Sequence, residues 1–411
     1  MEQMRRNLFF NTAGSLLFYF CQSAITILVL ALAGAEANGL LATAMTISNV
    51  ALSAASFGMR TFQVSDLEGK YSDRTYLFSR YITLLGALLG CIGFSLANSY
   101  SGQQRWIILL YTGYRLVESW SDVWHGYLQK AERMDIVGIS FGVRGLLTAG
   151  VIVVGLLLTS NLIPVLAVLF VANAVYVLAV DIPLARKRAD LAKRQGPGPW
   201  VLLAECLPLA ACAFLNTAIP SVPRYFCERL LGSTVMGYFS SIFLPVAVLQ
   251  VAVLYLFVPF ITTFARLWAE RQRLAYYKGL AILVAGLAVL WVAGSLGAAL
   301  LGRWGLHLLY PSTPALLDYV PLLQPLVLAT VCTVLSSVLI HLLTIARAMK
   351  ALLAGNLAGC LVALAVSSPL IARFGIYGAA YATILGVGVQ GLVLLAGLLV
   401  RCRLWFAQKE N

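Results

Sequence analysis

Residues 46–66 read TISNVALSAASFGMRTFQVSD and combine an apolar helical pattern with a single polar face. Polar side chains recur there at spacings of three or four residues, namely Thr46, Asn49, Ser53, Ser56, Arg60 and Gln63. An α-helix turns by about 100° per residue, so this spacing places all of them on one side. A continuous polar stripe is unfavourable in lipid. The stretch therefore predicts a membrane helix that faces other protein or a water-filled cavity, as in a transport path for a polar and anionic cargo.

The composition supports a membrane protein. The chain has 411 residues, of which 61% are apolar and 11% charged, whereas soluble domains carry about 25% charged residues. Apolar runs of about 20 residues follow one another, and the alternating pattern of barrel strands is absent. We therefore predict an all-α integral membrane protein. The formal charge of +13 is assigned to membrane topology and not to nucleic-acid binding.

Loop charges fit an even number of spans with both ends in the cytoplasm. With this topology, 22 of the 29 Lys and Arg residues fall in cytoplasmic loops and five in outer loops, as the positive-inside rule requires. The sequence thus predicts twelve transmembrane helices, at about 8–32, 38–63, 76–98, 105–128, 135–159, 162–183, 200–219, 234–264, 279–301, 320–346, 351–372 and 376–400.

A polar linker, residues 185–199, divides these helices into two sets of six. We predict an N-terminal lobe at 1–184 and a C-terminal lobe at 200–411. A GxxxxG pattern recurs between the first two helices of each half, at 34–39 and 232–237. Two halves in the same orientation predict pseudo-symmetric six-helix lobes around a central cavity.

The first predicted helix has a polar stripe of its own, formed by Asn7, Asn11, Ser15, Tyr19 and Gln22. Together with the second helix it could form one wall of the cavity. The alternative is that both stripes serve hydrogen bonding between helices.

The fourth helix is the most charged. Arg115, Glu118, Asp122 and His125 are spaced 3, 4 and 3 residues apart and share a face. Either Arg115 and Glu118 neutralise each other at i, i+3, or an acid couples a proton or cation beside a substrate-binding arginine. Glu118 and Asp122 are therefore candidates for ion coupling.

Arg144 lies near the middle of the fifth helix without an acid within four residues. It either pairs with Glu118 or Asp122 across helices, or supplies positive charge to a cavity. An arginine suits pyrophosphate because its planar guanidinium donates two parallel hydrogen bonds.

In the second half, Glu205 and Asn216 lie in the seventh helix, and Arg224 precedes Glu228 by four residues. A surface ion pair is the simple interpretation of Arg224. No Walker or HExxH motif occurs, so we predict neither an enzyme nor a cofactor. Three histidines and eight scattered cysteines predict no metal site.

The segments 57–83, 115–144 and 216–245 resemble bacterial polysaccharide and O-antigen repeat-unit flippases. These belong to the multidrug, oligosaccharidyl-lipid and polysaccharide (MOP) exporter superfamily. The resemblance implies two lobes, alternating access and an oligosaccharide cargo linked through pyrophosphate to a polyprenol. It also implies that cavity arginines hold the anionic head, which makes candidates of Arg60, Arg115, Arg144 and Arg224.

We therefore predict a flippase for lipid-linked oligosaccharide in the bacterial cytoplasmic membrane. Further substrate-binding candidates are polar residues of the spans, namely Asn11, Gln22, Asn49, Ser53 and Asn216. Expected partners are the bilayer, a polysaccharide polymerase and glycosyltransferases. The alternative is a cation-coupled multidrug or metabolite antiporter. Related extruders place an acid in the first helix of a lobe, where this chain offers only Glu205, in the seventh helix.

Overall fold

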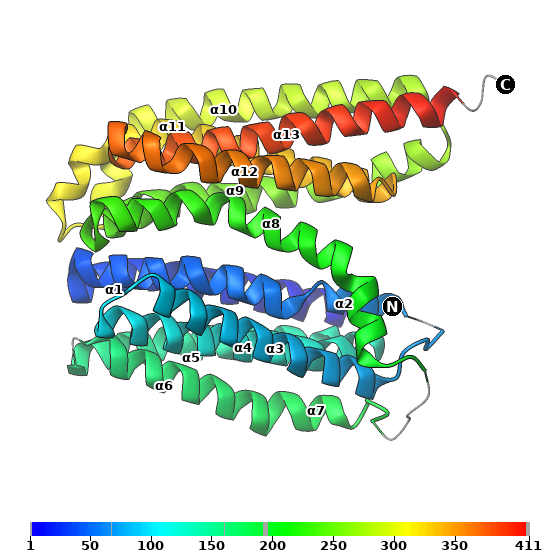
Figure 1. Ribbon diagram of the computed structural model, residues 1–411, viewed down its shortest axis with the longest axis horizontal. Helices are drawn as coiled ribbons and strands as arrows, with labels where there is room; N and C mark the ends of the chain where they lie inside the picture. The colour runs from blue at the N-terminus through cyan, green and yellow to red at the C-terminus, as the bar shows by residue number, and fades with distance from the viewer. Residues whose placement is uncertain (1, 67, 160, 192–195, 408–411) are drawn as a thin grey trace. The chain divides into compact units, whose positions relative to one another are not determined.

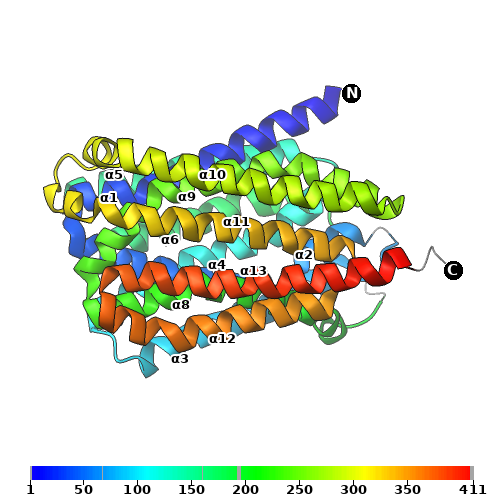
Figure 2. The same ribbon diagram turned by 90° about the horizontal axis from the view of Figure 1, so that it is seen from above.

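The computed structural model describes residues 2–66, 68–159, 161–191 and 196–407, and this part of the chain is helical without a β-strand. The α-helices shown in Figures 1 and 2 are α1 (Glu2–Ser56), α2 (Met59–Ser65), α3 (Asp73–Ala97), α4 (Gly102–Lys130), α5 (Met134–Thr159), α6 (Leu162–Tyr176), α7 (Ile182–Arg186), α8 (Pro199–Leu231), α9 (Ser233–Ala269), α10 (Arg273–Leu309), α11 (Leu323–Ile345), α12 (Met349–Phe374) and α13 (Ile376–Ala407). A π-helical turn, η1 (Val177–Asp181), follows α6, and a 3₁₀ segment, η2 (Pro314–Leu322), precedes α11.

The length and apolar content of these helices make the chain a multi-pass membrane protein. Ten helices in the described residues are long and apolar enough to cross a membrane, counting Gln3–Ser65 as one. That segment contains a kink at Gly34, where φ is 85°, so it holds two predicted spans. Helix α4 is 29 residues long but is too charged to count among the ten. The predicted all-α membrane fold is confirmed.

Packing divides the chain into two compact units, Met1–Thr217 and Ala218–Asn411. We call them the N-terminal and C-terminal units. The boundary lies inside α8, because the start of α8 buries Leu202, Leu203 and Cys206 in a core of the N-terminal unit. The role of residues 185–199 as the connection between two lobes stays a prediction.

The predicted second helix, 38–63, is broken in the structure. Helix α1 ends at Ser56, and α2 begins at Met59. Phe57 and Gly58 between them have φ angles of 52° and 62°, in the left-handed region that interrupts an α-helix. Arg60 therefore lies on a short separate helix and not at the end of a continuous span.

Several helices extend beyond the predicted apolar limits. The helix expected at 279–301 is α10, Arg273–Leu309, and the one expected at 234–264 continues in α9 to Ala269. The apolar run of a sequence marks the part that fits the hydrocarbon core, whereas a helix can continue beyond it. The prediction from the apolar runs therefore ended these two helices several residues too early and began α10 several residues too late.

Glycines allow α1 and α5 to approach closely. A Cβ atom added to Gly14 would collide with the carbonyl oxygen of Gly138, and one added to Gly138 would collide with that of Phe10. A Cβ at Gly145 would lie 2.9 Å from the Cα of Phe18. Small residues let membrane helices pack backbone to backbone. This seam fixes the position of the first half of α1 against α5.

Substitution at this seam should be costly. Gly138→Ala forces backbone atoms apart, and overpacking costs about 1–3 kcal/mol. Gly150→Ala, also on α5, meets no atom within 4 Å and should be neutral or stabilising, since alanine has the higher helix propensity. Thermal unfolding of the purified variants measures this difference. A Gly138→Ala protein as stable as Gly150→Ala would contradict the close packing.

Candidate functional site

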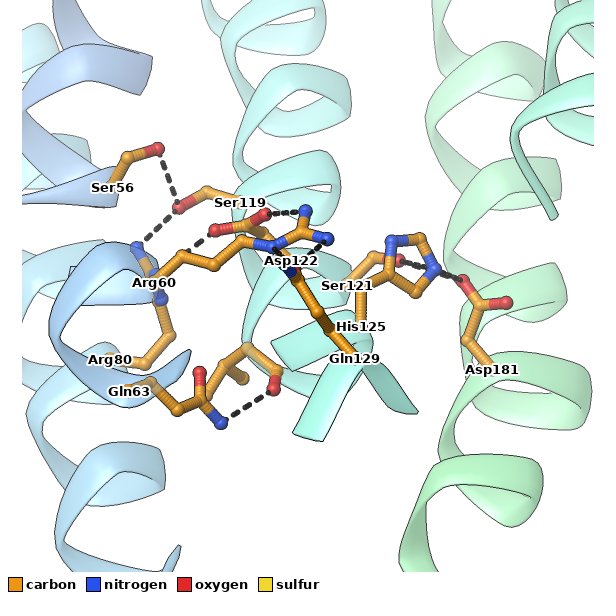
Figure 3. A network of polar contacts seen from close by, with 11 residues as sticks. Ser56, Arg60, Gln63, Arg80, Ser119, Ser121, Asp122, His125, Gln129 and Asp181 are labelled. Carbon is orange, nitrogen blue, oxygen red and sulfur yellow. Dashed lines mark hydrogen bonds and ion pairs between the residues drawn. The ribbon is translucent and has the colours of Figure 1, made fainter. Parts of the chain in front are cut away.

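The polar stripe of α1 and α2 faces the charged stripe of α4 inside the N-terminal unit. Asn49 accepts a hydrogen bond from Arg115 at 3.1 Å, and the hydroxyls of Ser56 and Ser119 are 3.5 Å apart. Further along, Gln63 donates to the carbonyl oxygen of Val123 at 3.1 Å. Residue numbers rise together on the two sides, so the second half of α1 and α4 run parallel. The predicted polar face thus contacts α4 from Asn49 to Gln63, and Figure 3 shows the part from Ser56 to Gln63.

Asp122 bridges two arginines at the centre of this contact, as Figure 3 shows. Arg60 Nη1 lies 2.7 Å from Asp122 Oδ1, and Arg80 Nη2, from α3, lies 3.4 Å from Asp122 Oδ2. We call these three residues the Asp122 bridge. Arg60 also donates to the side-chain oxygen of Gln129 from Nε and Nη2, at 3.1 and 3.0 Å. One carboxylate thus accepts hydrogen bonds from two guanidinium groups that belong to different helices.

The two arginines differ in their access to solvent. Arg80 is 0% exposed and donates from Nη1 to the carbonyl oxygen of Ala55 at 2.6 Å and to the hydroxyl of Ser119 at 3.0 Å. Arg60 and Asp122 keep 25% and 26% of their side-chain surface exposed. Arg80 is therefore a fixed buried charge, whereas Arg60 and Asp122 face open space.

That space is a cavity of about 230 Å³ within the N-terminal unit. We call it the N-terminal cavity. Its walls come from α1, α2, α4 and α5, and its lining residues are Ser15, Phe18, Tyr19, Leu52, Ser56, Arg60, Glu118, Ser119, Asp122, His125 and Phe141. Both predicted stripes thus contribute to the lining, together with aromatic rings. Hydroxyls, a guanidinium and two carboxylates make it a site for a polar or charged group.

Arg115 and Glu118 form an i, i+3 ion pair, which is the first of the two alternatives that their spacing allowed. Arg115 Nη1 lies 2.6 Å from Glu118 Oε2, and both side chains are largely buried. Because Arg115 also donates to Asn49, its charge is satisfied within the protein. Glu118 lines the N-terminal cavity, but Arg115 does not.

His125 connects this cavity to a buried carboxylate. Its Nε2 atom lies 3.2 Å from the hydroxyl of Ser121 and 3.4 Å from Asp181 Oδ2. Asp181, at the end of the π-helical turn η1, accepts hydrogen bonds from Ser121 at 2.7 Å and from Ser140 at 2.8 Å. These contacts satisfy an acid that would be costly alone in a membrane helix.

Arg144 occupies neither of its two predicted positions. It is 0% exposed and does not line the N-terminal cavity. Its Nε atom lies 3.4 Å from the side-chain oxygen of Asn173 on α6. Glu118 pairs instead with Arg115, and Asp122 pairs with the other two members of the Asp122 bridge. Burial between α5 and α6 excludes direct contact with a cargo in this conformation.

The remaining candidates are dispersed over the two units. Asn11 and Ser53 are half-buried, and Asn216 is exposed on α8. Gln22 donates a hydrogen bond to the hydroxyl of Tyr114. In the C-terminal unit, the guanidinium carbon of Arg224 lies 4.3 Å from the centre of the Phe243 ring, a cation–π distance. None of these five residues lines the N-terminal cavity.

Glu205 belongs to an exposed ion pair. Its Oε1 atom lies 2.6 Å from Lys70 Nζ in the connection between α2 and α3, with both side chains more than a third exposed. The hydrogen bond to Glu205 raises the pKa of Lys70. In the same connection, burial would raise the pKa of Asp66, but hydrogen bonds from the backbone N–H groups of Tyr71 and Lys70 and from the Tyr76 hydroxyl lower it. These contacts order the connection at the surface.

Two site residues were missed in the sequence. Arg80 was counted as a loop charge although it lies inside the span predicted at 76–98, and in the structure it lies two turns into α3. Asp181 was overlooked although it is an acid at the end of an apolar run, 162–183, which is itself a signal in a membrane helix. Only the fold shows that they complete the environments of Asp122 and His125.

Comparisons with solved structures give the fold. The chain aligns with an inward-facing multidrug-resistance MATE family transporter of the MOP superfamily at a TM-score of 0.73 and 11% identity, covering 99% of both chains. It aligns with a eukaryotic MATE transporter at 0.62 and 11% identity, covering 99% of this chain and 98% of that one. The chain has the MATE transporter fold.

A third neighbour is a MOP superfamily transporter from Pyrococcus furiosus, described as having a binding pocket of reversed polarity that suggests a different function. Its TM-score is 0.63 at 13% identity, with 100% of this chain and 96% of that chain covered. No protein-family profile and no curated relative matches the sequence. The comparisons thus confirm the predicted fold, whereas membership of the polysaccharide flippase family stays a prediction.

The burial of Arg80 leads to a stability prediction. Arg80→Met removes the second guanidinium from Asp122 and the donors to Ala55 and Ser119. Breaking a buried charge pair costs about 3–5 kcal/mol, so the melting temperature of the purified protein should fall clearly. Arg74→Met removes an arginine of the same helix that packs on Phe78 and should change stability by about 0.5 kcal/mol or less. Equal losses in the two variants would contradict the assigned role of Arg80.

Proposed function

We propose that the protein is a membrane transporter that moves a polyprenyl-pyrophosphate-linked oligosaccharide between the leaflets of a bacterial cytoplasmic membrane. The observation that carries this proposal is the Asp122 bridge at the wall of a polar cavity, in a chain with a transporter fold. The sequence resemblance to repeat-unit flippases supports the same class of cargo.

The charges around the cavity favour an anion. Arg60, Arg80 and Arg115 contribute three positive charges, and Glu118 and Asp122 contribute two negative ones. This ion-paired network thus has a net charge of +1, with one arginine and two acids in the cavity lining itself. A guanidinium donates two parallel hydrogen bonds to phosphate oxygens, which suits a pyrophosphate. Hydroxyls of Ser15 and Ser56 on the same walls suit sugar hydroxyls.

The cavity also fits a lipid-linked cargo in size. A volume of about 230 Å³ accommodates a pyrophosphate and part of a sugar but not a polyprenyl chain, since ligand pockets for drug-sized molecules already occupy about 300–1,000 Å³. We propose that the polyprenyl tail stays in lipid while the head group contacts the N-terminal cavity. Alternating access of the two units would then release the head on the other side.

The expected orientation and partners follow from the same proposal. The distribution of loop charges supports cytoplasmic termini. The Arg60 end of the α1–α2 stripe would then face the cytoplasm, where a lipid-linked repeat unit is made. Glycosyltransferases would supply the cargo, and a polymerase would consume it on the outer face.

Cells provide the direct test. In a strain lacking this protein, unflipped lipid-linked repeat units should accumulate on the inner leaflet, and the wild-type gene should clear them. Arg60→Gln should restore export to about a tenth of wild type or less, because loss of a charge-assisted hydrogen bond costs about 1.5–3 kcal/mol. Arg74→Gln is the matched control and should restore export fully. The proposal fails if repeat units do not accumulate without the protein.

A cation-coupled antiporter is the second candidate function. Its support comes from the two carboxylates that line the cavity, Glu118 and Asp122, and from MATE transporters as structural neighbours. This candidate predicts that cells expressing the protein extrude small cationic dyes and that Asp122→Asn abolishes the extrusion. The exposed pair with Lys70 makes Glu205 the less suitable coupling residue. Absence of dye extrusion from cells with verified membrane insertion would exclude this candidate.

A further inference from the structure

The Asp122 bridge has a geometry that resembles a bound oxyanion. Its two carboxylate oxygens each accept from a different guanidinium, Oδ1 from Arg60 and Oδ2 from Arg80 (Figure 3). A phosphate oxygen pair can accept from two arginines in the same way. The bridge has a net charge of +1 with Asp122 in place and +2 without it. Asp122 thus occupies the position in which the two arginines would hold an anionic ligand.

Access to the two arginines is unequal. Arg60 and Asp122 line the N-terminal cavity, whereas Arg80 does not and is 0% exposed. An anion entering the cavity therefore meets one guanidinium, that of Arg60, and two carboxylates that repel it, those of Glu118 and Asp122. Arg80 is enclosed by its contacts with Ala55, Ser119 and Asp122, and of these Ser119 and Asp122 line the cavity.

The attachment of Arg60 allows such a rearrangement. Helix α2 has only seven residues and is separated from α1 by Phe57 and Gly58, both in the left-handed region. Short non-helical segments of this kind absorb backbone rotation at hinges. Arg60 can therefore shift relative to Asp122 without bending α1, while Arg80 stays fixed on α3 by Ala55 and Ser119.

We propose that Asp122 is an internal competitor for the phosphate group of the cargo. It neutralises Arg60 and covers Arg80 when the cavity is empty, and the phosphate displaces it to bind both arginines. The inference rests on the proposed function, because it assumes an anionic cargo. The physical consequence is a lowered affinity, which suits a transporter that must release what it binds.

Neutralising Asp122 tests this competition on the purified full-length protein. The probes are inorganic pyrophosphate and farnesyl pyrophosphate, measured by titration calorimetry in detergent. Asp122→Asn should bind pyrophosphate at least about tenfold more tightly than wild type, which corresponds to about 1.4 kcal/mol. Tighter binding of farnesyl pyrophosphate than of inorganic pyrophosphate would support a lipid-linked source of the phosphate.

Glu118→Gln is the matched control. Glu118 lies one turn from Asp122 on α4, lines the same cavity and carries the same charge, but it pairs with Arg115. A general electrostatic effect would strengthen binding equally in both variants. Internal competition predicts that Glu118→Gln changes the affinity for pyrophosphate by less than about threefold. In that variant Asn49 still holds Arg115 and Asp122 still covers Arg80. Equal gains in the two variants would overturn the inference.

A second substitution tests whether Arg80 becomes a ligand. Arg80→Lys keeps the charge but loses the two-pronged donor geometry. It should reduce pyrophosphate affinity at least about fivefold in the Asp122→Asn background and less than about twofold in the wild-type background, with folding verified by thermal unfolding. Equal effects in both backgrounds would overturn the inference, as would the absence of pyrophosphate binding in every variant. Export of repeat units in cells is measured separately, so failure here is distinguishable from failure of the proposed function.

Discussion

Charges buried on α4 impose the main constraint on the N-terminal unit. An ionised side chain at the centre of a membrane helix costs about 2.5–3.5 kcal/mol on insertion scales, so α4 is stable in a membrane only if its charges find partners. The structure supplies them from three directions. Arg60 comes from α2, Arg80 from α3 and Asn49 from α1. The packing of these helices around α4 is thus tied to the satisfaction of its polar side chains.

Close backbone packing complements these polar contacts. The glycine seam holds the first half of α1 against α5, and the kink at Gly34 lets the second half of α1 place its polar stripe against α4. Aromatic rings of Phe18 and Phe141, 5.4 Å apart, then close the cavity beside the charged residues. Lipid provides little hydrophobic drive for association between helices, so small residues and polar contacts must supply it.

The fold restricts the function but does not choose the cargo. Identities of 11–13% to the solved transporters give the architecture, whereas the chemistry of the cavity depends on side chains of this chain. The cavity lining holds one arginine and two acids, and Arg80 and Arg115 pair with those acids from outside the lining. A transporter benefits from moderate affinity, since a cargo that is held too tightly is not released. A carboxylate that competes with the cargo for the same guanidinium groups provides such moderation.

The sequence alone determined the membrane class, the long helical segments and the polar face shared by residues 46–66 and by α4, because these follow from composition and from local periodicity. It also suggested Arg60, Glu118 and Asp122 as neighbours of a cavity. It could not decide between the alternatives for Arg115, since an i, i+3 pair and a substrate arginine have the same spacing. The helix break at Phe57–Gly58 was hidden in an otherwise regular pattern.

Only the tertiary structure decided which charges are available to a ligand. Arg144 resembled a cavity arginine in sequence but is enclosed beside Asn173, while Arg80 resembled a loop charge but is buried in contact with Asp122. Asp181 acquired its partners from α4 and α5, far away in the chain. Periodicity describes one helix at a time. Pairing between helices depends on how they pack, and in a membrane that pairing decides whether a charge is structural or free to bind.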